Sequence, residues 1–302
     1  TDLFVSLTAQ AEDLRPIIEN KLISRYLGPW LGWINEPQGG IAVTLDLKGS
    51  LNRPSMKGRV VLEDFQCRFS GLPLPLKKAN GILRFRSSGV TFSGVKGLIG
   101  DSAAEMSGEI FPQKMDVSGE LKGAPQDLRK LNLLPNGWMV SGNIPLSLKL
   151  TGNPSAMNFS THLDLKSNAL RIDPFIKKKP GVPLLLEASG SGNQAGVTIE
   201  EAYLVLDDSR ISAKATIDNE GKIVASINLP PKGIPTSILI PITDPALEVQ
   251  AGGRIDGDAT IRIGTNKTRD VSVDANVALN HLSLHLIGMH KRMEGITGSV
   301  RW

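Results

Sequence analysis

The chain has 302 residues, of which 40% are hydrophobic and 21% charged, a composition typical of a folded globular protein. Its 34 basic and 30 acidic residues are scattered and give a net charge of +4, without the basic stripe and interleaved aromatics of a nucleic-acid-binding surface. Because Cys67 is the single cysteine, an intrachain disulfide and a cysteine-based metal site are both excluded.

The first predicted element is an amphipathic helix at residues 13–27. Asp13 is a suitable N-cap, and Gly28 with the following proline ends the helix. Apolar residues recur at helical spacing along one side: Leu14, Ile17, Ile18, Leu22 and Tyr26. No apolar run reaches the roughly 18 residues of a membrane span, so we expect any anchor or targeting segment to lie outside this sequence.

Strict alternation of apolar and polar residues follows at 41–48 and predicts a half-buried strand. The same alternation returns at 146–150, 159–165, 211–217, 223–229 and 271–279. With 31 glycines, 19 prolines and few aromatics, the rest of the chain is expected to form turns. The sequence therefore predicts an all-β fold dominated by an antiparallel sheet.

Several landmarks recur in the same order and predict an internal repeat of roughly 105–115 residues. The glycine that ends a strand appears as Gly49, Gly152 and Gly264. A Gly-Val-Thr strand start appears at 89–91 and at 196–198. Three basic pairs each lie three residues before a glycine: Lys77 with Lys78, Lys177 with Lys178, and Lys291 with Arg292.

These landmarks divide the chain into a lead-in and three copies of the repeat. We expect a strand and helix at 1–38, copies at 39–141 and 142–252, and an incomplete copy at 253–302. Short helical lead-ins are predicted again after Asp127 and after Pro235. The copies are expected to form one continuous sheet in a fragment of a longer chain.

Residues for catalysis or metal binding do not come together in the sequence. His281 and His285 are the closest histidines, and on a strand they would lie about 13 Å apart, too far to share a metal ion. Cys67 has no neighbouring histidine to activate its thiol, and neither a nucleophile elbow nor a dinucleotide-binding loop occurs. We therefore expect no enzyme activity, no metal and no cofactor.

The order of these motifs resembles the AsmA-like family of diderm bacterial envelope proteins, which includes TamB-type proteins. The resemblance rests on strands that end in Lys-Gly or Thr-Gly, on the following Pro54 and Pro154, on the Lys-Lys-x-x-Gly turns and on the Gly-Val-Thr strands. It covers nearly the whole chain, and its motifs are structural glycines, prolines and alternation.

The resemblance implies a long, twisted antiparallel sheet that curls into an open groove, a β-taco. It implies a periplasmic protein that is anchored in the inner membrane by a segment outside this chain and has a possible partner protein at the outer membrane. The expected cargo is phospholipid or another acyl lipid, carried between the two membranes. An aliphatic surface suits that cargo, because each buried methylene contributes about 0.8 kcal/mol.

Two sets of residues are predicted to serve this role. Aliphatic residues on one face would line the groove: Ile41, Val43, Leu45, Leu47, Leu146, Leu148, Leu150, Leu163, Leu165, Ile211, Ile217, Val271 and Val273. The basic pairs would meet phosphate head groups along a rim: Lys77, Lys78, Lys177, Lys178, Lys291 and Arg292. A solvated turn flank is the alternative role of each basic pair.

Two other functions are compatible with a repeated β-chain. The first is a non-enzymatic scaffold that binds protein strands by β-addition during outer-membrane protein assembly. The second, a β-solenoid enzyme that acts on polysaccharide, is disfavoured because its rungs would have about 20–30 residues and its carboxylates would cluster.

Overall fold

The computed structural model describes residues 2–10, 34–50, 53–86, 89–153, 155–172, 176–206, 209–235, 249–263, 271–286 and 293–301. Strands make up 77% of the structure and helix 3%, which confirms the predicted all-β fold. The chain divides into two compact units. Unit 1 comprises Thr1–Leu134 and Pro145–Pro154, and unit 2 comprises Pro135–Ile144 and Ser155–Trp302.

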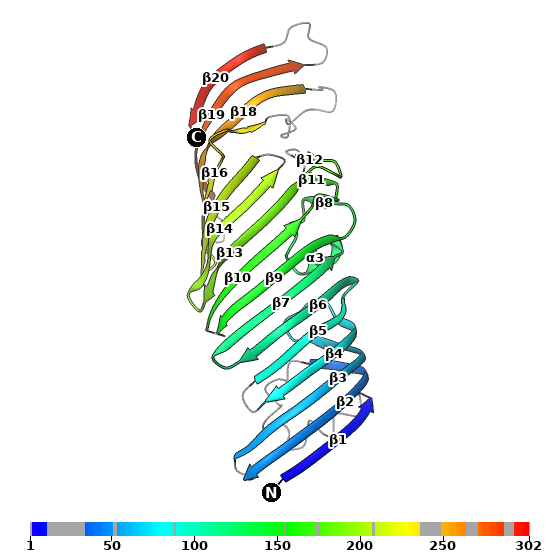
Figure 1. Ribbon diagram of the computed structural model, residues 1–302. Coiled ribbons are helices and arrows are strands. Elements are labelled where there is room, and N and C mark those ends of the chain that lie inside the picture. The colour runs from blue at the N-terminus through cyan, green and yellow to red at the C-terminus, as the bar shows by residue number, and fades with distance from the viewer. Residues whose placement is uncertain are drawn as a thin grey trace. The chain divides into compact units, whose positions relative to one another are not determined.

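Unit 1 is an antiparallel sheet in which the strands β1 to β7 pair in chain order, each of the first six with the next one. Strand β9 lies beside β7 (Figure 1). The strands are β1 (Asp2–Gln10), β2 (Ile34–Ser50), β3 (Arg53–Phe69), β4 (Leu76–Arg86), β5 (Gly89–Ile99), β6 (Ser102–Phe111), β7 (Lys114–Gly123) and β9 (Ile144–Asn153).

The long strands β2 and β3 are bent where their pairing register shifts, near Gln38 and after Leu62. Asp64 adopts a left-handed conformation there with φ of 48°, and its N–H donates to Asn80 Oδ1 at 3.1 Å. Gly39, with φ of 96°, faces this bend so closely that a Cβ would lie 2.5 Å from the Asp64 carbonyl oxygen. Only glycine fits that position without displacing the backbone.

The bend gathers the core of unit 1. Ile41, Leu62, Phe65, Cys67 and Ala79 are all buried and form one cluster. Half-buried aliphatic residues of the same strands, including Val43, Val60 and Leu83, pack against this cluster. The core therefore lies on the face of the sheet that the alternation at 41–48 assigned to apolar side chains.

Helix α3 (Pro125–Lys130) follows β7 and begins with proline at its first turn, where the missing N–H costs nothing. Asp127, after which the sequence predicted a helix start, lies inside α3 and is buried, as is Leu128. The predicted helix at 13–27 and the start after Pro235 lie outside the described residues.

Unit 2 is also built on antiparallel strands, and β18 pairs with β16 along one part of its length and with β17 along another. The spatial order of the other strands follows the chain (Figure 1). The strands are β10 (Ala156–Asp164), β13 (Leu184–Asn193), β14 (Gly196–Leu206), β15 (Ser209–Asp218), β16 (Ile223–Asn228), β17 (Ile234–Pro235), β18 (Val249–Ile263), β19 (Val271–Leu286) and β20 (Met293–Arg301).

A small three-stranded sheet also belongs to unit 2. It consists of β8 (Trp138–Val140), β11 (Leu170–Ile172) and β12 (Ile176–Lys178), with β11 in the centre. Asn168 is buried beneath it, and its side-chain amide donates to the carbonyl oxygens of Ser141 and Asn143. Leu170 of β11 is only 2% exposed, as is Leu165 just after β10.

Three neighbouring strands of the two units correspond in length or position. β5 and β14 both have 11 residues, and β6 and β15 both have 10. The start of β14 follows that of β5 by the same number of residues as the start of β15 follows that of β6. The end of β13 follows the end of β4 by this number as well. The correspondence is lost between β10 and β13, where the small sheet replaces the short turn that joins β3 to β4.

In neither unit does the sheet close into a barrel. Among the residues described here, no helix is both long and apolar enough to cross a membrane.

Candidate functional site

The pairing register of unit 1 aligns apolar residues into rows that run across the strands. Val43 of β2 lies opposite Val60 of β3, which lies opposite Leu83 of β4, and Leu83 lies opposite Phe92 of β5. Residues directly opposite each other in an antiparallel pair project from the same face. A row of four apolar residues therefore crosses β2 to β5.

Unit 2 repeats this arrangement over more strands. One row joins Val197, Ile217, Ile223 and Ile263 across β14, β15, β16 and β18. Parallel rows on the same face consist of Ile199, Ala215, Ala225, Ile261 and Val273, and of Leu163, Leu186, Leu204 and Ile211. The apolar face of unit 2 is thus built from small and branched aliphatic residues in register.

The opposite faces carry polar rows. In unit 1, one row runs through Thr44, Arg59, Arg84, Thr91 and Glu109. In unit 2, Tyr203, Ser212, Asn228, Asp258 and Asn276 form the corresponding row. The period-2 alternation of the sequence therefore separates each sheet into an aliphatic and a polar face.

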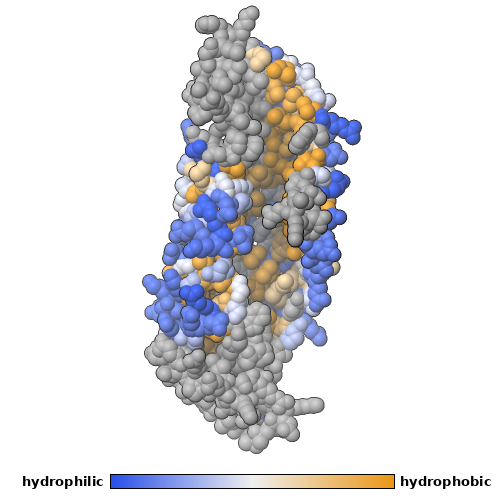
Figure 2. Space-filling view, turned by 180° about the vertical axis from the view of Figure 1, so that it is seen from behind, coloured by the Kyte–Doolittle hydropathy of each residue, from blue (hydrophilic) through white to orange (hydrophobic). Residues whose placement is uncertain are grey.

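Part of the apolar surface stays accessible. Val197 is 38% exposed, Met106 40% and Leu148 42%. Figure 2 shows hydrophobic side chains that gather in a band with hydrophilic residues along its borders. Exposed aliphatic surface of this kind is a candidate for binding an apolar ligand, because removing apolar surface from water lowers the free energy.

The predicted lining residues occupy several environments. Ile41 is buried in the core of unit 1, Leu148 is exposed, and Leu165 is buried just beyond the end of β10, where its N–H donates to the Leu184 carbonyl oxygen. The half-buried residues are Val43, Leu146, Leu150, Leu163, Ile211, Ile217 and Val273. Leu45 and Leu47 of β2 and Val271 of β19 are placed in their strands, and their side chains lie outside the described part.

The predicted rim residues that the structure describes belong to two different units. Lys77 is half-buried and Lys78 is exposed, both in β4 of unit 1. Lys178 is only 5% exposed and lies in the small sheet of unit 2. The side chain of Lys177 and the whole of Lys291 and Arg292 lie outside the described residues.

Lys178 is instead a buried cation with backbone partners. Its Nζ donates to the carbonyl oxygens of Asn168 at 2.6 Å, Lys179 at 3.1 Å and Lys166 at 3.4 Å. Burial lowers the pKa of Lys178 below its ordinary value, and the negative charge of Asp164 opposes that shift. The side chain therefore ties the loop of residues 165–169 to β12.

The titratable groups that could carry chemistry are dispersed. His281 and His285 both lie on β19, as expected for a strand, and His162 Nδ1 lies 3.2 Å from Glu187 Oε1. Burial raises the pKa of the Cys67 thiol to about 11, so this sulfur stays protonated at neutral pH. Within the described ranges, no three His, Cys, Asp or Glu side chains form a group that could hold a metal ion.

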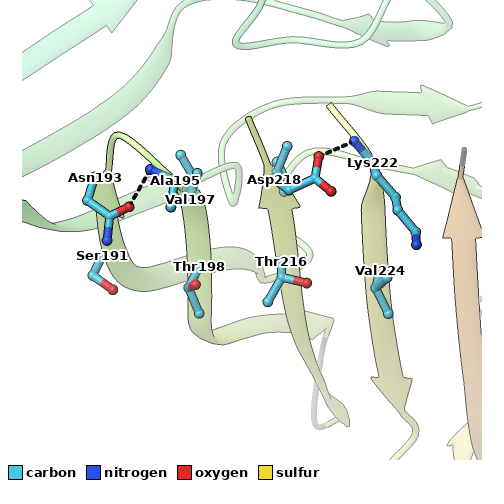
Figure 3. Close-up of a pocket in the computed structure, with 11 residues that line it drawn as sticks. Ser191, Asn193, Ala195, Val197, Thr198, Thr216, Asp218, Lys222 and Val224 are labelled. Atoms are coloured by element: carbon cyan, nitrogen blue, oxygen red, sulfur yellow. Dashed lines mark hydrogen bonds between the residues drawn. The ribbon is translucent and has the colours of Figure 1, made fainter. Parts of the chain in front are cut away.

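A shallow pocket of 330 Å³, lined by both polar and apolar residues, lies at the hairpin end of β13 to β16 and was not predicted from the sequence. Figure 3 shows Ser191, Thr198, Thr216 and Val224 on four successive strands along this pocket. Its signal in the sequence was a small polar residue at matching positions of three successive strands, at Ser191, Thr198 and Thr216. Asp218 Oδ1 accepts the N–H groups of Lys222 at 2.8 Å and Glu220 at 3.0 Å, so this carboxylate shapes a turn.

No protein-family model matches the chain, and neither does a curated protein or a solved structure. The resemblance to the AsmA-like family therefore stays a prediction, and the function is argued from the two-faced sheets.

Proposed function

We propose that this chain is a non-enzymatic segment of an AsmA-like lipid conduit, in which the aliphatic faces form an open groove for phospholipid acyl chains. The segment would stand in the periplasm of a diderm bacterium, anchored to the inner membrane through another part of the protein. Its cargo would pass between the inner and outer membranes. The observation that carries this proposal is the set of aliphatic rows that cross strand after strand in both units.

The energetics favour an acyl chain on such a surface. Burying about ten methylenes contributes about 8 kcal/mol, at about 0.8 kcal/mol each. The rows of unit 2 consist of Val, Ile, Leu and Ala side chains without a hydrogen-bonding group. A ligand held there would be selected for its hydrocarbon chain and would be free to slide, because no polar contact fixes its position.

Two features support the wider family assignment. The equal shifts of β5 to β14 and of β6 to β15 support a repeated unit. The bend at Asp64 and Gly39 supports a curled sheet, because bulges turn a strand towards one face. The repeat over the full chain and the continuous groove are part of the proposal.

Site-specific photo-crosslinking tests the groove. A benzophenone amino acid would replace Val43 or Ile217 on the aliphatic rows, with Thr44 and Thr216 as matched controls one residue away on the polar face. The full chain would be mixed with vesicles of phosphatidylethanolamine and phosphatidylglycerol that carry a radiolabelled acyl chain. We expect label at Val43 and Ile217 and little at either threonine.

Two results would contradict the proposal. Equal labelling at all four positions would mean that lipid contacts the protein without using the aliphatic face. Absence of lipid label at both Val43 and Ile217, with crosslinks to a protein strand instead, would favour the interaction scaffold.

A further inference from the structure

A basic quartet lies on the polar face of unit 1, the face opposite the aliphatic rows. It consists of Lys57 and Arg59 of β3 and Arg84 and Arg86 of β4, and all four side chains are exposed. The register places Arg59 directly opposite Arg84 and Lys57 directly opposite Arg86. Neighbouring strands lie about 4.8 Å apart and alternate residues about 7 Å apart, so the four positions form a compact rectangle.

Like charges directly opposite each other destabilise a sheet. Some other exposed cations of unit 1 are paired with carboxylates: Arg68 with Glu36 at 3.0 Å, Lys96 with Glu105 at 3.3 Å, and Lys114 with Glu109. Within the described part of the chain, no quartet residue has an ion pair within the 4.0 Å limit.

Asp46, the acid nearest in register, forms no ion pair with the quartet. Its backbone lies directly opposite Lys57, yet its carboxylate is paired with Lys48 of its own strand at 3.8 Å. The quartet thus keeps its mutual repulsion even with a carboxylate on the neighbouring strand. An anion from outside would relieve that repulsion and gain charge-assisted hydrogen bonds from two guanidinium groups.

We propose that the basic quartet binds a compact anion that bears one or two phosphate groups. The size of the anion is limited by acidic residues on both sides of the quartet. Beyond Thr91 the polar row continues to Glu109, and Asp46 lies on the other side. A broad anionic surface would meet these acids, whereas a diphosphate spans only the four cations. The phosphate groups can belong to a free molecule or to a lipid head group. This inference does not depend on the proposed groove, because it uses the other face of the sheet.

Calorimetric titration of the full chain with inorganic pyrophosphate tests the quartet. The variant would be Arg59→Gln with Arg84→Gln. The matched control would be Lys214→Gln with Arg262→Gln, two exposed cations on polar strand positions of unit 2 that lie opposite Ser226 and Val224. We expect saturable binding that weakens with salt, at least about tenfold weaker in the quartet variant and unchanged in the control.

Thermal unfolding gives a second readout that does not depend on heat of binding. Pyrophosphate should raise the melting temperature of the wild type and of the control variant, and not that of the quartet variant. Without ligand, the quartet variant should melt at or above the wild-type temperature, because it removes a like-charge pair. A quartet variant that retains full binding, or a control that loses it equally, would overturn the proposal.

Vesicle flotation identifies the source of the phosphate. Phosphatidylcholine vesicles with and without phosphatidic acid would be compared, with pyrophosphate as competitor. Quartet-dependent flotation with phosphatidic acid that pyrophosphate reverses supports a lipid head group. Pyrophosphate binding without flotation supports a free phosphate compound. No binding of pyrophosphate by the wild type would refute the site, whatever the vesicles do.

Discussion

Ser102 Oγ donates a hydrogen bond of 2.8 Å to Asp127 Oδ2, which joins the start of β6 to helix α3 across 25 residues of sequence. The same carboxylate oxygen accepts the Asp101 N–H at 2.7 Å, and Ser102 Oγ accepts the Ala124 N–H at 2.9 Å. Both Ser102 and Asp127 are almost fully buried. This buried pair fixes the end of β7 and α3 against the β5–β6 turn.

Replacing Asp127 with alanine should lower the free energy of unfolding by about 2–4 kcal/mol, because it leaves the Ser102 hydroxyl and the Asp101 N–H without an acceptor. Ser102→Ala should cost about 1–3 kcal/mol for the same reason. Urea denaturation of both single variants and the double variant measures the interaction energy between the two side chains. Glu120→Gln, an exposed change on β7, is the control and should have almost no effect. Strictly additive effects would show that the two side chains do not act together.

Because of Cys67, we expect the folded state to lose stability at alkaline pH. The thiol pKa rises from 9.0 in the unfolded chain to about 11 in the folded one, because burial disfavours the thiolate. Between these values the unfolded chain releases a proton that the folded chain keeps, so stability falls as the pH rises. The difference in free energy of unfolding between the wild type and Cys67→Ala should shrink by about 2–3 kcal/mol from pH 8.5 to pH 11. A constant difference would contradict the buried, protonated thiol.

For Lys178 we expect the opposite dependence of stability on pH. Burial lowers its folded pKa below the ordinary value, so at moderately alkaline pH the unfolded chain holds the proton more tightly than the folded one. Stability from this group therefore rises with pH through that window. The free energy of unfolding of the wild type relative to Lys178→Met should increase from pH 7 towards pH 10. Lys179→Met, an exposed neighbour, should not change this slope.

The groove proposal predicts that one charge on an aliphatic row blocks lipid. Ile217→Glu would place a carboxylate between Val197 and Ile223, where an acyl chain would have to desolvate it. Lipid capture by a benzophenone at the nearby Ile199 should fall about tenfold or more. Thr216→Glu adds the same charge on the polar face and should leave capture intact. If both glutamates reduce capture equally, a general effect of charge explains the loss.

Alternation predicted the strands well because each sheet has one aliphatic and one polar face. The alternation at 41–48 lies within β2, that at 211–217 within β15 and that at 271–279 within β19. Alternation does not specify which residue of the neighbouring strand lies opposite each position. The opposition of Arg59 and Arg84 depends on where the register shifts between β3 and β4, and these shifts depend on tertiary contacts.

Leu165 shows how a local contact ends a pattern. It continues the alternation of Phe159 and Leu163, so it was predicted to line the sheet. Asp164 Oδ1 accepts the N–H of Lys166 at 2.8 Å, a turn that ends β10 just before Leu165, whose own N–H still donates to the Leu184 carbonyl oxygen of β13 at 2.8 Å. The basic pair at 177–178 differs from that at 77–78 for a related reason, because the loop at 165–169 supplies carbonyl oxygens that hold Lys178.

The aliphatic rows run across the strands, so a chain molecule lying along one of them would meet a new strand about every 4.8 Å. Each step in unit 2 offers a similar surface, from Val197 to Ile217 to Ile223 to Ile263. Successive positions then have nearly equal energy, and movement in either direction faces equally small barriers. On the proposed function, the direction of lipid flow would be set by supply at one end and removal at the other, while the sheet acts as a passive track.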